Sequence, residues 1–121
     1  MTTTITDVST VAIPVTDQDR AVSFYVEVLG FDKRVDVTTA TGMRWIVVAP
    51  SGARCDLALI AGAAGIDTGI RLSATDVERE HGAMTSHRVD VDDIVRWPGV
   101  PAMYTFRDPD GNTLYVVETE R

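Results

Sequence analysis

The stretch FRDPDGNTLYVVE, residues 106–118, contains the pattern that decides the fold of this chain. Its turn, DPDGN at 108–112, combines a proline that fixes φ with a glycine that adopts positive φ cheaply. The flanking runs AMYTFR (102–107) and TLYVVE (113–118) are rich in β-branched and aromatic residues. Together these segments predict two strands joined by a tight turn.

The turn and helix-start residues of the chain recur at a constant offset of 59 residues. Thr16, Asp17, Arg20, Pro50 and Gly52 correspond to Thr75, Asp76, Arg79, Pro109 and Gly111. One offset therefore aligns a strand-to-helix junction and a hairpin turn without a gap. Such internal similarity predicts two copies of one structural unit.

The first copy has the pattern of a βαβββ unit. Apolar residues alternate along 10–15, which predicts a half-buried strand, and Thr16 or Asp17 can cap the helix that follows. Gly30 provides the expected end of that helix. Three further strands are predicted, over 31–37, 43–49 and 55–60.

The second copy repeats this order after a Gly/Ala-rich linker. Its helix is expected to open with a capping box formed by Thr75 and Glu78. The predicted elements are a strand at 69–74, a helix at 75–87 and strands at 89–95, 102–107 and 113–118. The chain is thus expected to be one α+β domain, 1–121, of two modules, 8–60 and 69–118. The modules would form a curved mixed sheet around a concave pocket, with the helices on its outer face.

Composition excludes several classes of protein. The chain has 121 residues, 45% of them hydrophobic, and its single cysteine cannot form an internal disulfide. Its formal charge of −7, without a basic patch, argues against nucleic-acid binding. We see no secretory signal and no apolar run that could span a membrane, so a cytoplasmic location is expected.

Two segments together resemble the vicinal oxygen chelate superfamily. These are TVAIPVTDQDRAVSFYVEVLGF (10–31) and FRDPDGNTLYVVE (106–118). That superfamily includes glyoxalase I, bleomycin-resistance and fosfomycin-resistance proteins and extradiol dioxygenases. The resemblance implies its two-module fold, also called the glyoxalase/bleomycin resistance/dihydroxybiphenyl dioxygenase fold. It also implies a small-molecule site on the inner face of the sheet.

The same resemblance implies that metal ligands are missing. In the metalloenzymes of the superfamily, ligands lie on inward-facing strand positions that correspond here to Thr10, Asp56, Gly69 and Tyr115. Only Asp56 is a suitable ligand among these, whereas a divalent metal typically takes about three or more His, Asp, Glu or Cys ligands. We therefore expect no metal and no other cofactor.

Strand parity and the constant offset predict which residues line the pocket. They place Trp45 and Tyr104 at equivalent positions, and likewise Val47 and Phe106. The candidate ligand-binding residues are Thr10, Trp45, Asp56, Arg71, Tyr104, Phe106 and Tyr115. An arginine on an inward face needs a partner, so Arg71 is expected either to pair with Asp56 or to meet an anionic ligand.

Three functions fit this reading. The first is a binding protein of the bleomycin-resistance type, which holds a small molecule without a catalytic metal; the acidic balance would favour a cationic ligand. The second is an enzyme, either a metal-dependent lyase, isomerase or dioxygenase with an atypical site or a metal-free enzyme using Tyr115 or Asp56. The third is a partner-binding module. No catalytic residue is identified. A homodimer is expected, because each chain offers two four-stranded halves that must be closed into cups, either within one chain or by exchange of halves between two chains.

Overall fold

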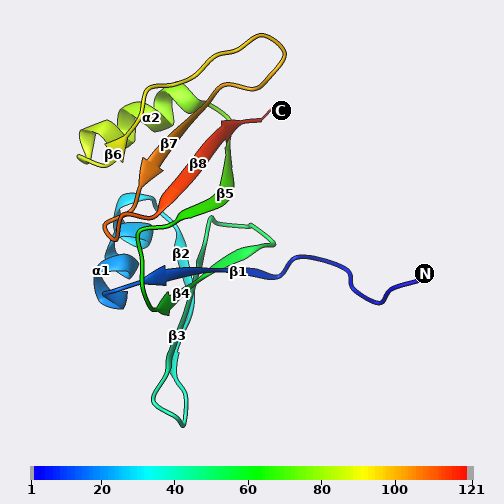
Figure 1. Cartoon of the computed structure of the whole chain (residues 1–121), viewed down its shortest axis with the longest axis vertical. Coiled ribbons are helices and arrows are strands. Elements are labelled where there is room, and N and C mark those ends of the chain that lie inside the picture. Colours follow the sequence, from blue (N-terminus) through cyan, green and yellow to red (C-terminus); the bar gives the residue numbers. More distant parts are fainter. Residues whose placement is uncertain (1, 120–121) are drawn as a thin grey trace.

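The computed structural model describes residues 2–119 and consists of two βαβββ modules (Figure 1). The first module contains β1 (Thr10–Val15), α1 (Gln18–Val22), η1 (Ser23–Val28), β2 (Asp32–Thr38), β3 (Arg44–Ala49) and β4 (Asp56–Ala61). The second contains β5 (Asp67–Ala74), α2 (Val77–Ser86), β6 (Asp90–Val91), β7 (Met103–Arg107) and β8 (Thr113–Glu118).

Each module forms its own four-stranded mixed sheet. Sheet 1 has the order β1-β4-β3-β2 and sheet 2 the order β5-β8-β7-β6. In each sheet the first and last strands of the module pair in parallel, and the other pairs are antiparallel. This arrangement confirms the predicted fold class and the internal repeat.

The two helices begin at equivalent aspartates. The side chain of Asp17 accepts a hydrogen bond from the Arg20 amide at 3.0 Å, and Asp76 accepts one from the Arg79 amide at 3.1 Å. Each carboxylate satisfies an N–H group that the helix leaves free. The predicted capping box of Thr75 is therefore wrong, because Asp76 is the N-cap residue.

The first helix continues as a π-helix, η1, which places Phe24 and Tyr25 in the core. At the end of η1, the backbone hydrogen bond spans five residues: the amide of Leu29 donates to the carbonyl of Phe24. Gly30, with φ of +78°, then reverses the chain. A glycine adopts this conformation without the steric cost of a side chain.

The strand predicted over 89–95 is much shorter than expected. Only Asp90 and Val91 form β6, and Val95 makes an isolated bridge to Met103. The following segment contains Pro98, which has no amide hydrogen to donate to a sheet. It therefore leaves the sheet as a loop that projects beyond the body of the molecule (Figure 1).

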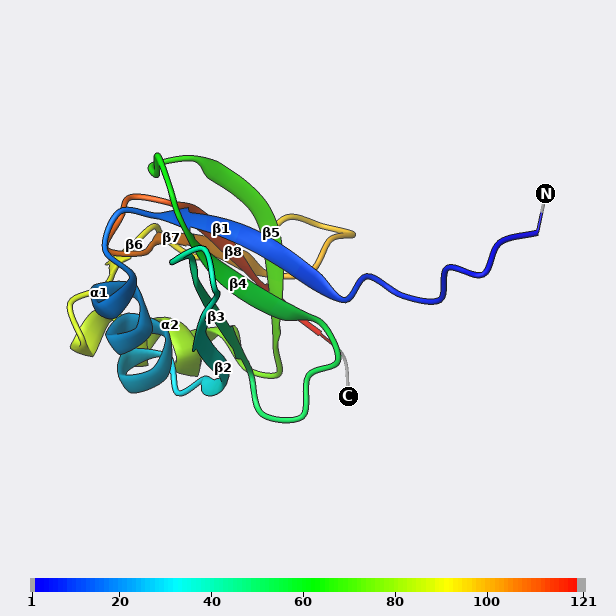
Figure 2. The same cartoon turned by 90° about the horizontal axis from the view of Figure 1, so that it is seen from below.

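The helix-covered faces of both sheets share one hydrophobic core. Alternate residues of sheet 1, such as Ile46 and Leu59, belong to the same buried cluster as Phe106 and Val116 of sheet 2. The rings of Phe24 and Phe106 are 6.3 Å apart across the two modules. Figure 2 shows α1 and α2 on the same side of the molecule. The opposite face of each sheet, here called its outward face, lies outside this core.

Polar residues of the β7–β8 turn tie the modules together. Tyr25 donates a 2.8 Å hydrogen bond to buried Asp108. The fully buried amide of Asn112 donates to the carbonyl of Pro14 and accepts from the amides of Gly65 and Ile66. One turn thus joins the first strand, the first helix and the linker.

Candidate functional site: the outward faces of the two sheets

The outward face of sheet 1 is predominantly apolar. Its cross-strand pairs include Val37 with Trp45 and Val47 with Ala58. The alternate residues of β3 and β4, namely Ile46, Val48, Leu57 and Leu59, point into the core. Val37 is 54% exposed and Trp45 is partly buried. Val47 and Ala58 are buried, so the open apolar surface of this face is the part around Val37 and Trp45.

A polar group closes one end of this face. Thr10 donates a hydrogen bond of 2.5 Å to Asp56, and a guanidinium nitrogen of Arg34 lies 3.8 Å from the other oxygen of that carboxylate. Arg34 also donates to the carbonyl of Ala53 at 2.6 Å. Both carboxylate oxygens of Asp56 therefore have partners within sheet 1.

Sheet 2 carries Tyr115 and Arg71 side by side on its outward face. Tyr115 and Arg71 are register partners on β8 and β5, and the guanidinium carbon lies 4.1 Å from the centre of the tyrosine ring. A cation over an aromatic face is a favourable arrangement. Arg71 also donates a 2.7 Å hydrogen bond to the carbonyl of Gly69.

Asp67 completes this group. The Tyr115 hydroxyl donates to Asp67 at 2.7 Å, and the Gly69 amide donates to the same side chain at 3.0 Å. The hydrogen bond from Tyr115 and that from Gly69 lower the pKa of Asp67. The bond to Asp67 in turn raises the pKa of Tyr115 above the ordinary value of a phenol.

Two predicted site residues lie in the core instead. Tyr104 is 1% exposed with its hydroxyl 3.3 Å from the sulfur of Met84, and Phe106 is fully buried. Ala58 and Val117 are equivalent positions under the offset of 59 residues. Ala58 pairs with Val47 in sheet 1, whereas Val117 pairs with Met103 in sheet 2, so the hairpin between the paired residues is three residues longer in sheet 2. An odd shift in register moves every side chain of a strand to its other face. The constant offset therefore assigns the side chains of β7 to the wrong face of the sheet.

The remaining five predicted residues form two separate groups rather than one pocket. Thr10, Trp45 and Asp56 lie on sheet 1, whereas Arg71 and Tyr115 lie on sheet 2. Among residues 2–119, no hydrogen bond or ion pair joins the two groups. Of the two partners expected for Arg71, Asp56 is excluded within the chain, because Thr10 and Arg34 hold its carboxylate.

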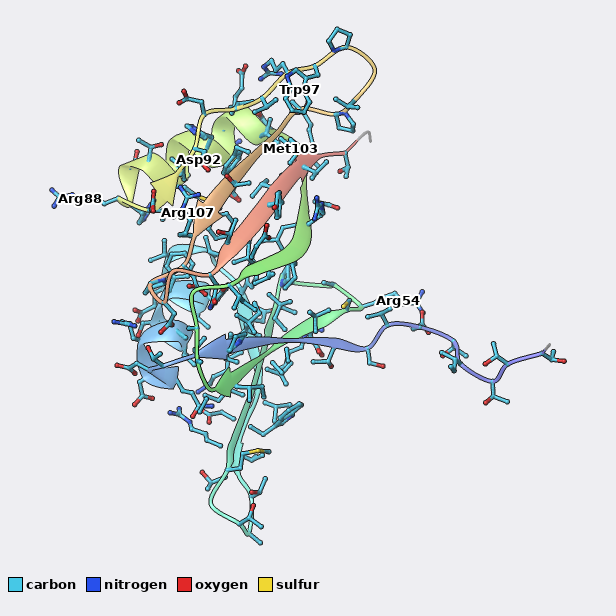
Figure 3. The ribbon with its side chains drawn as sticks, viewed as in Figure 1. Arg54, Arg88, Asp92, Trp97, Met103 and Arg107 are labelled. Carbon is cyan, nitrogen blue, oxygen red and sulfur yellow. The ribbon has the colours of Figure 1, made fainter. Side chains whose placement is uncertain are left out.

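The sequence reading missed a charged cluster at the far edge of sheet 2. Arg107 donates to both Asp90 and Asp92, with nitrogen–oxygen distances of 3.0 and 2.7 Å. Figure 3 shows Arg107 close to Asp92. Thr105 also bonds to Asp92. Hydrogen bonds from Arg107 and Thr105 lower the pKa of Asp92. Alternation along β7 places Thr105 opposite Tyr115 and Arg107 opposite Thr113, on the same face of sheet 2. The correct parity of β7 would have predicted this.

A cavity of about 630 Å³ opens along the free edge of β5. Residues 68–73 form one wall, and Val11 and Leu57 of sheet 1 contribute to the other. Arg71 and Gly69 line this cavity and also belong to the group around Tyr115. Cys55, an exposed free thiol, lies at its border rather than in the core.

The residues present do not fit a catalytic metal. At the four positions that the family resemblance assigns to metal ligands, the chain offers the hydroxyl groups of Thr10 and Tyr115, the carboxylate of Asp56 and no side chain at Gly69. The described residues contain no cluster of three or more His, Cys, Asp or Glu able to hold a metal. No reaction step is therefore derived through a metal.

Comparison with known proteins identifies the family. Residues 7–116 match the model of the Glyoxalase/Bleomycin resistance protein/Dioxygenase superfamily, and the chain belongs to this superfamily. It is 28% identical to the uncharacterized protein YetH of Bacillus subtilis (strain 168), with 94% of this chain and 99% of YetH covered.

Two solved structures are particularly similar. One is a superfamily member from Sphaerobacter thermophilus DSM 20745, with a TM-score of 0.91, 32% identity and coverage of 95% of this chain and 98% of that one. The other is TnmS3, an antibiotic binding protein from Streptomyces sp. CB03234, with a TM-score of 0.87 and 31% identity. That match covers 98% of this chain and all of TnmS3.

Within residues 2–119, every helix is too short or too polar to cross a lipid bilayer.

Proposed function

We propose that this protein binds a small molecule between the outward faces of two sheets, without a metal. The observation that carries the proposal is the uncovered apolar face of sheet 1, where Trp45 lies beside Val37. Ligand sites combine apolar and aromatic walls with a few polar groups. Thr10 and Asp56 provide polar groups at the end of this face.

We further propose that the site is completed in a homodimer. Within one chain the helix-covered faces are packed together, so the two outward faces cannot close on each other. A two-fold axis would place sheet 1 of one copy against sheet 2 of the second copy, twice. Each cup, meaning the space enclosed by sheet 1 of one copy and sheet 2 of the other, would then combine Thr10, Trp45 and Asp56 with Arg71 and Tyr115 of the second copy.

The similarity to TnmS3 supports this proposal. That protein is described as antibiotic binding, and the match extends over almost the whole of both chains. Fold likeness alone does not fix function, because one fold supports many activities. The support therefore depends on the combination of this relative with the apolar face around Trp45.

Fluorescence of the two tryptophans offers a direct test. Coumarin, a neutral aromatic lactone that accepts energy from tryptophan, would be titrated into Trp97→Phe, which retains Trp45, and into Trp45→Phe, which retains exposed Trp97. We expect saturable quenching in the first variant only. Affinity should be unchanged by EDTA. Equal quenching of both variants, or none in either, would contradict the proposed site.

A further inference from the structure

The cavity along β5 has aliphatic walls. Leu57 is almost fully buried, and Val11, Ile70 and Leu72 are partly buried residues that pack against the core on one side. All four line the cavity, and no aromatic ring does. Its volume of about 630 Å³ lies within the range of small-molecule sites. These walls suit a flexible aliphatic group.

A single charged side chain, Arg71, borders this cavity. Its guanidinium has five N–H donors, of which one bonds to the Gly69 carbonyl. Arg71 takes part in none of the nine ion pairs of residues 2–119. The ring of Tyr115 packs against one side of the Arg71 guanidinium. This contact limits the conformational entropy that Arg71 loses when it binds a ligand.

The neighbouring carboxylate is already engaged. Asp67 accepts hydrogen bonds from the Tyr115 hydroxyl and the Gly69 amide, and it is not among the residues that line the cavity. The other polar side chains of the cavity, including Thr68 and Ser73, are neutral. Arg71 is therefore the one charged side chain in the lining of the cavity, although the whole chain has a formal charge of −7. An anionic group is the matching partner.

We propose that this cavity binds an aliphatic monocarboxylate, with the chain against Leu57, Ile70 and Leu72 and the carboxylate on Arg71. This site goes beyond the function proposed above, because it lies within one chain and does not use Trp45, although Arg71 is common to the two sites. Arg71 can offer two parallel N–H donors, which match the two oxygens of a carboxylate. The proposal replaces the expectation of a cationic ligand.

Three probes of equal chain length test the charge preference: decanoate, decanol and decyltrimethylammonium. Binding to the full chain would be measured by calorimetry below the micellar concentrations. A second readout is the rate at which N-ethylmaleimide alkylates Cys55, the single thiol, which lies at the border of the cavity. We expect decanoate to bind at least tenfold more tightly than the other two and to slow alkylation.

Matched variants locate the site. Arg71→Gln should reduce the preference for decanoate over decanol to less than threefold, whereas Arg79→Gln, a change on exposed α2, should leave it intact. Ala53→Trp places a large ring at the cavity wall and should abolish decanoate binding. Trp45→Phe should weaken coumarin binding but leave decanoate binding unchanged.

Several outcomes would overturn the proposal. If decanoate binds no better than decanol, or if Arg71→Gln retains the preference, Arg71 does not recognise the anion. If Trp45→Phe weakens decanoate binding and Ala53→Trp does not, the anion binds on the outward faces instead. If none of the three probes binds while coumarin does, the cavity is not a ligand site, and the function proposed for the outward faces stands.

Discussion

Individual buried polar residues join the two modules, and Asn112 is the clearest example. Its side chain makes four hydrogen bonds, to the amides of Gly65 and Ile66, the carbonyl of Pro14 and the carboxylate of Asp108. A hydrophobic pattern cannot reveal such a role, because the residue reads as part of a turn. The buried amide serves as a structural link between modules.

Replacement of Asn112 by Ala should lower the free energy of unfolding by about 2–3 kcal/mol, because buried partners are left without hydrogen bonds. Urea denaturation followed by tryptophan fluorescence would measure the change. Thr41→Ala, in the exposed β2–β3 hairpin, is the control and should change stability by less than about 0.5 kcal/mol. A loss of similar size in both variants would show that the amide network does not stabilise the fold.

Tyr25 should lower the free energy of unfolding as the pH rises in the alkaline range. Burial, together with Asp108, raises the pKa of its phenol well above the ordinary value of 10.0. Above about pH 10 the unfolded chain releases this proton while the folded chain retains it, so stability falls as pH rises. Its contribution to the slope is about 1.4 kcal/mol per pH unit. Urea midpoints from pH 9 to 11 should fall less steeply in Tyr25→Phe; parallel curves would contradict this assignment.

At the scale of elements, the alternation of side chains along β7 decides which of its residues lie in the core and which lie on the outward face. Met103, Thr105 and Arg107 lie on the outward face, whereas Tyr104 and Phe106 are buried. The hairpin turn was predicted correctly from DPDGN, but the pairing beyond it was not. A turn specifies where the chain reverses, whereas the pairing register also depends on which side chains fit against α2 and η1.

Alanine substitutions on β7 test this parity. Tyr104→Ala should destabilise the protein by about 3–5 kcal/mol, because it leaves a cavity in the core beside Met84 and His81. Met103→Ala, one residue away on the outward face, should cost about 1 kcal/mol or less. Denaturant unfolding of both variants provides the measurement. The reverse order of stability would favour the parity given by the constant offset.

At the scale of the whole molecule, the open face of sheet 1 predicts association. A chain of 13.1 kDa should sediment as a species of about twice that mass at micromolar concentration. Val37→Glu places a charge on the apolar face and should yield monomers. Ala83→Glu, on the exposed side of α2, should remain dimeric. A monomeric parent protein, or a dimeric Val37→Glu variant, would contradict the proposed cup.

The sequence by itself determined the repeat, the order of strands and helices, the hairpin turns and the faces of β1, β4, β5 and β8. These features follow from local signals, namely alternation, capping aspartates and turn residues, which act over a few neighbouring positions. Together with the family resemblance, they predicted Thr10, Trp45, Asp56, Arg71 and Tyr115 as the lining of one pocket, whereas the structure divides these residues between sheet 1 and sheet 2.

Only the tertiary structure decided which faces meet. It buried Tyr104 and Phe106, paired Asp56 with Arg34 and left Arg71 without a carboxylate partner among the described residues. It also directed the two outward faces away from a single shared core. The physical reason is that register and module packing depend on contacts between residues far apart in the chain. No local pattern encodes the three-residue difference between the two hairpins, which reverses the faces of β7.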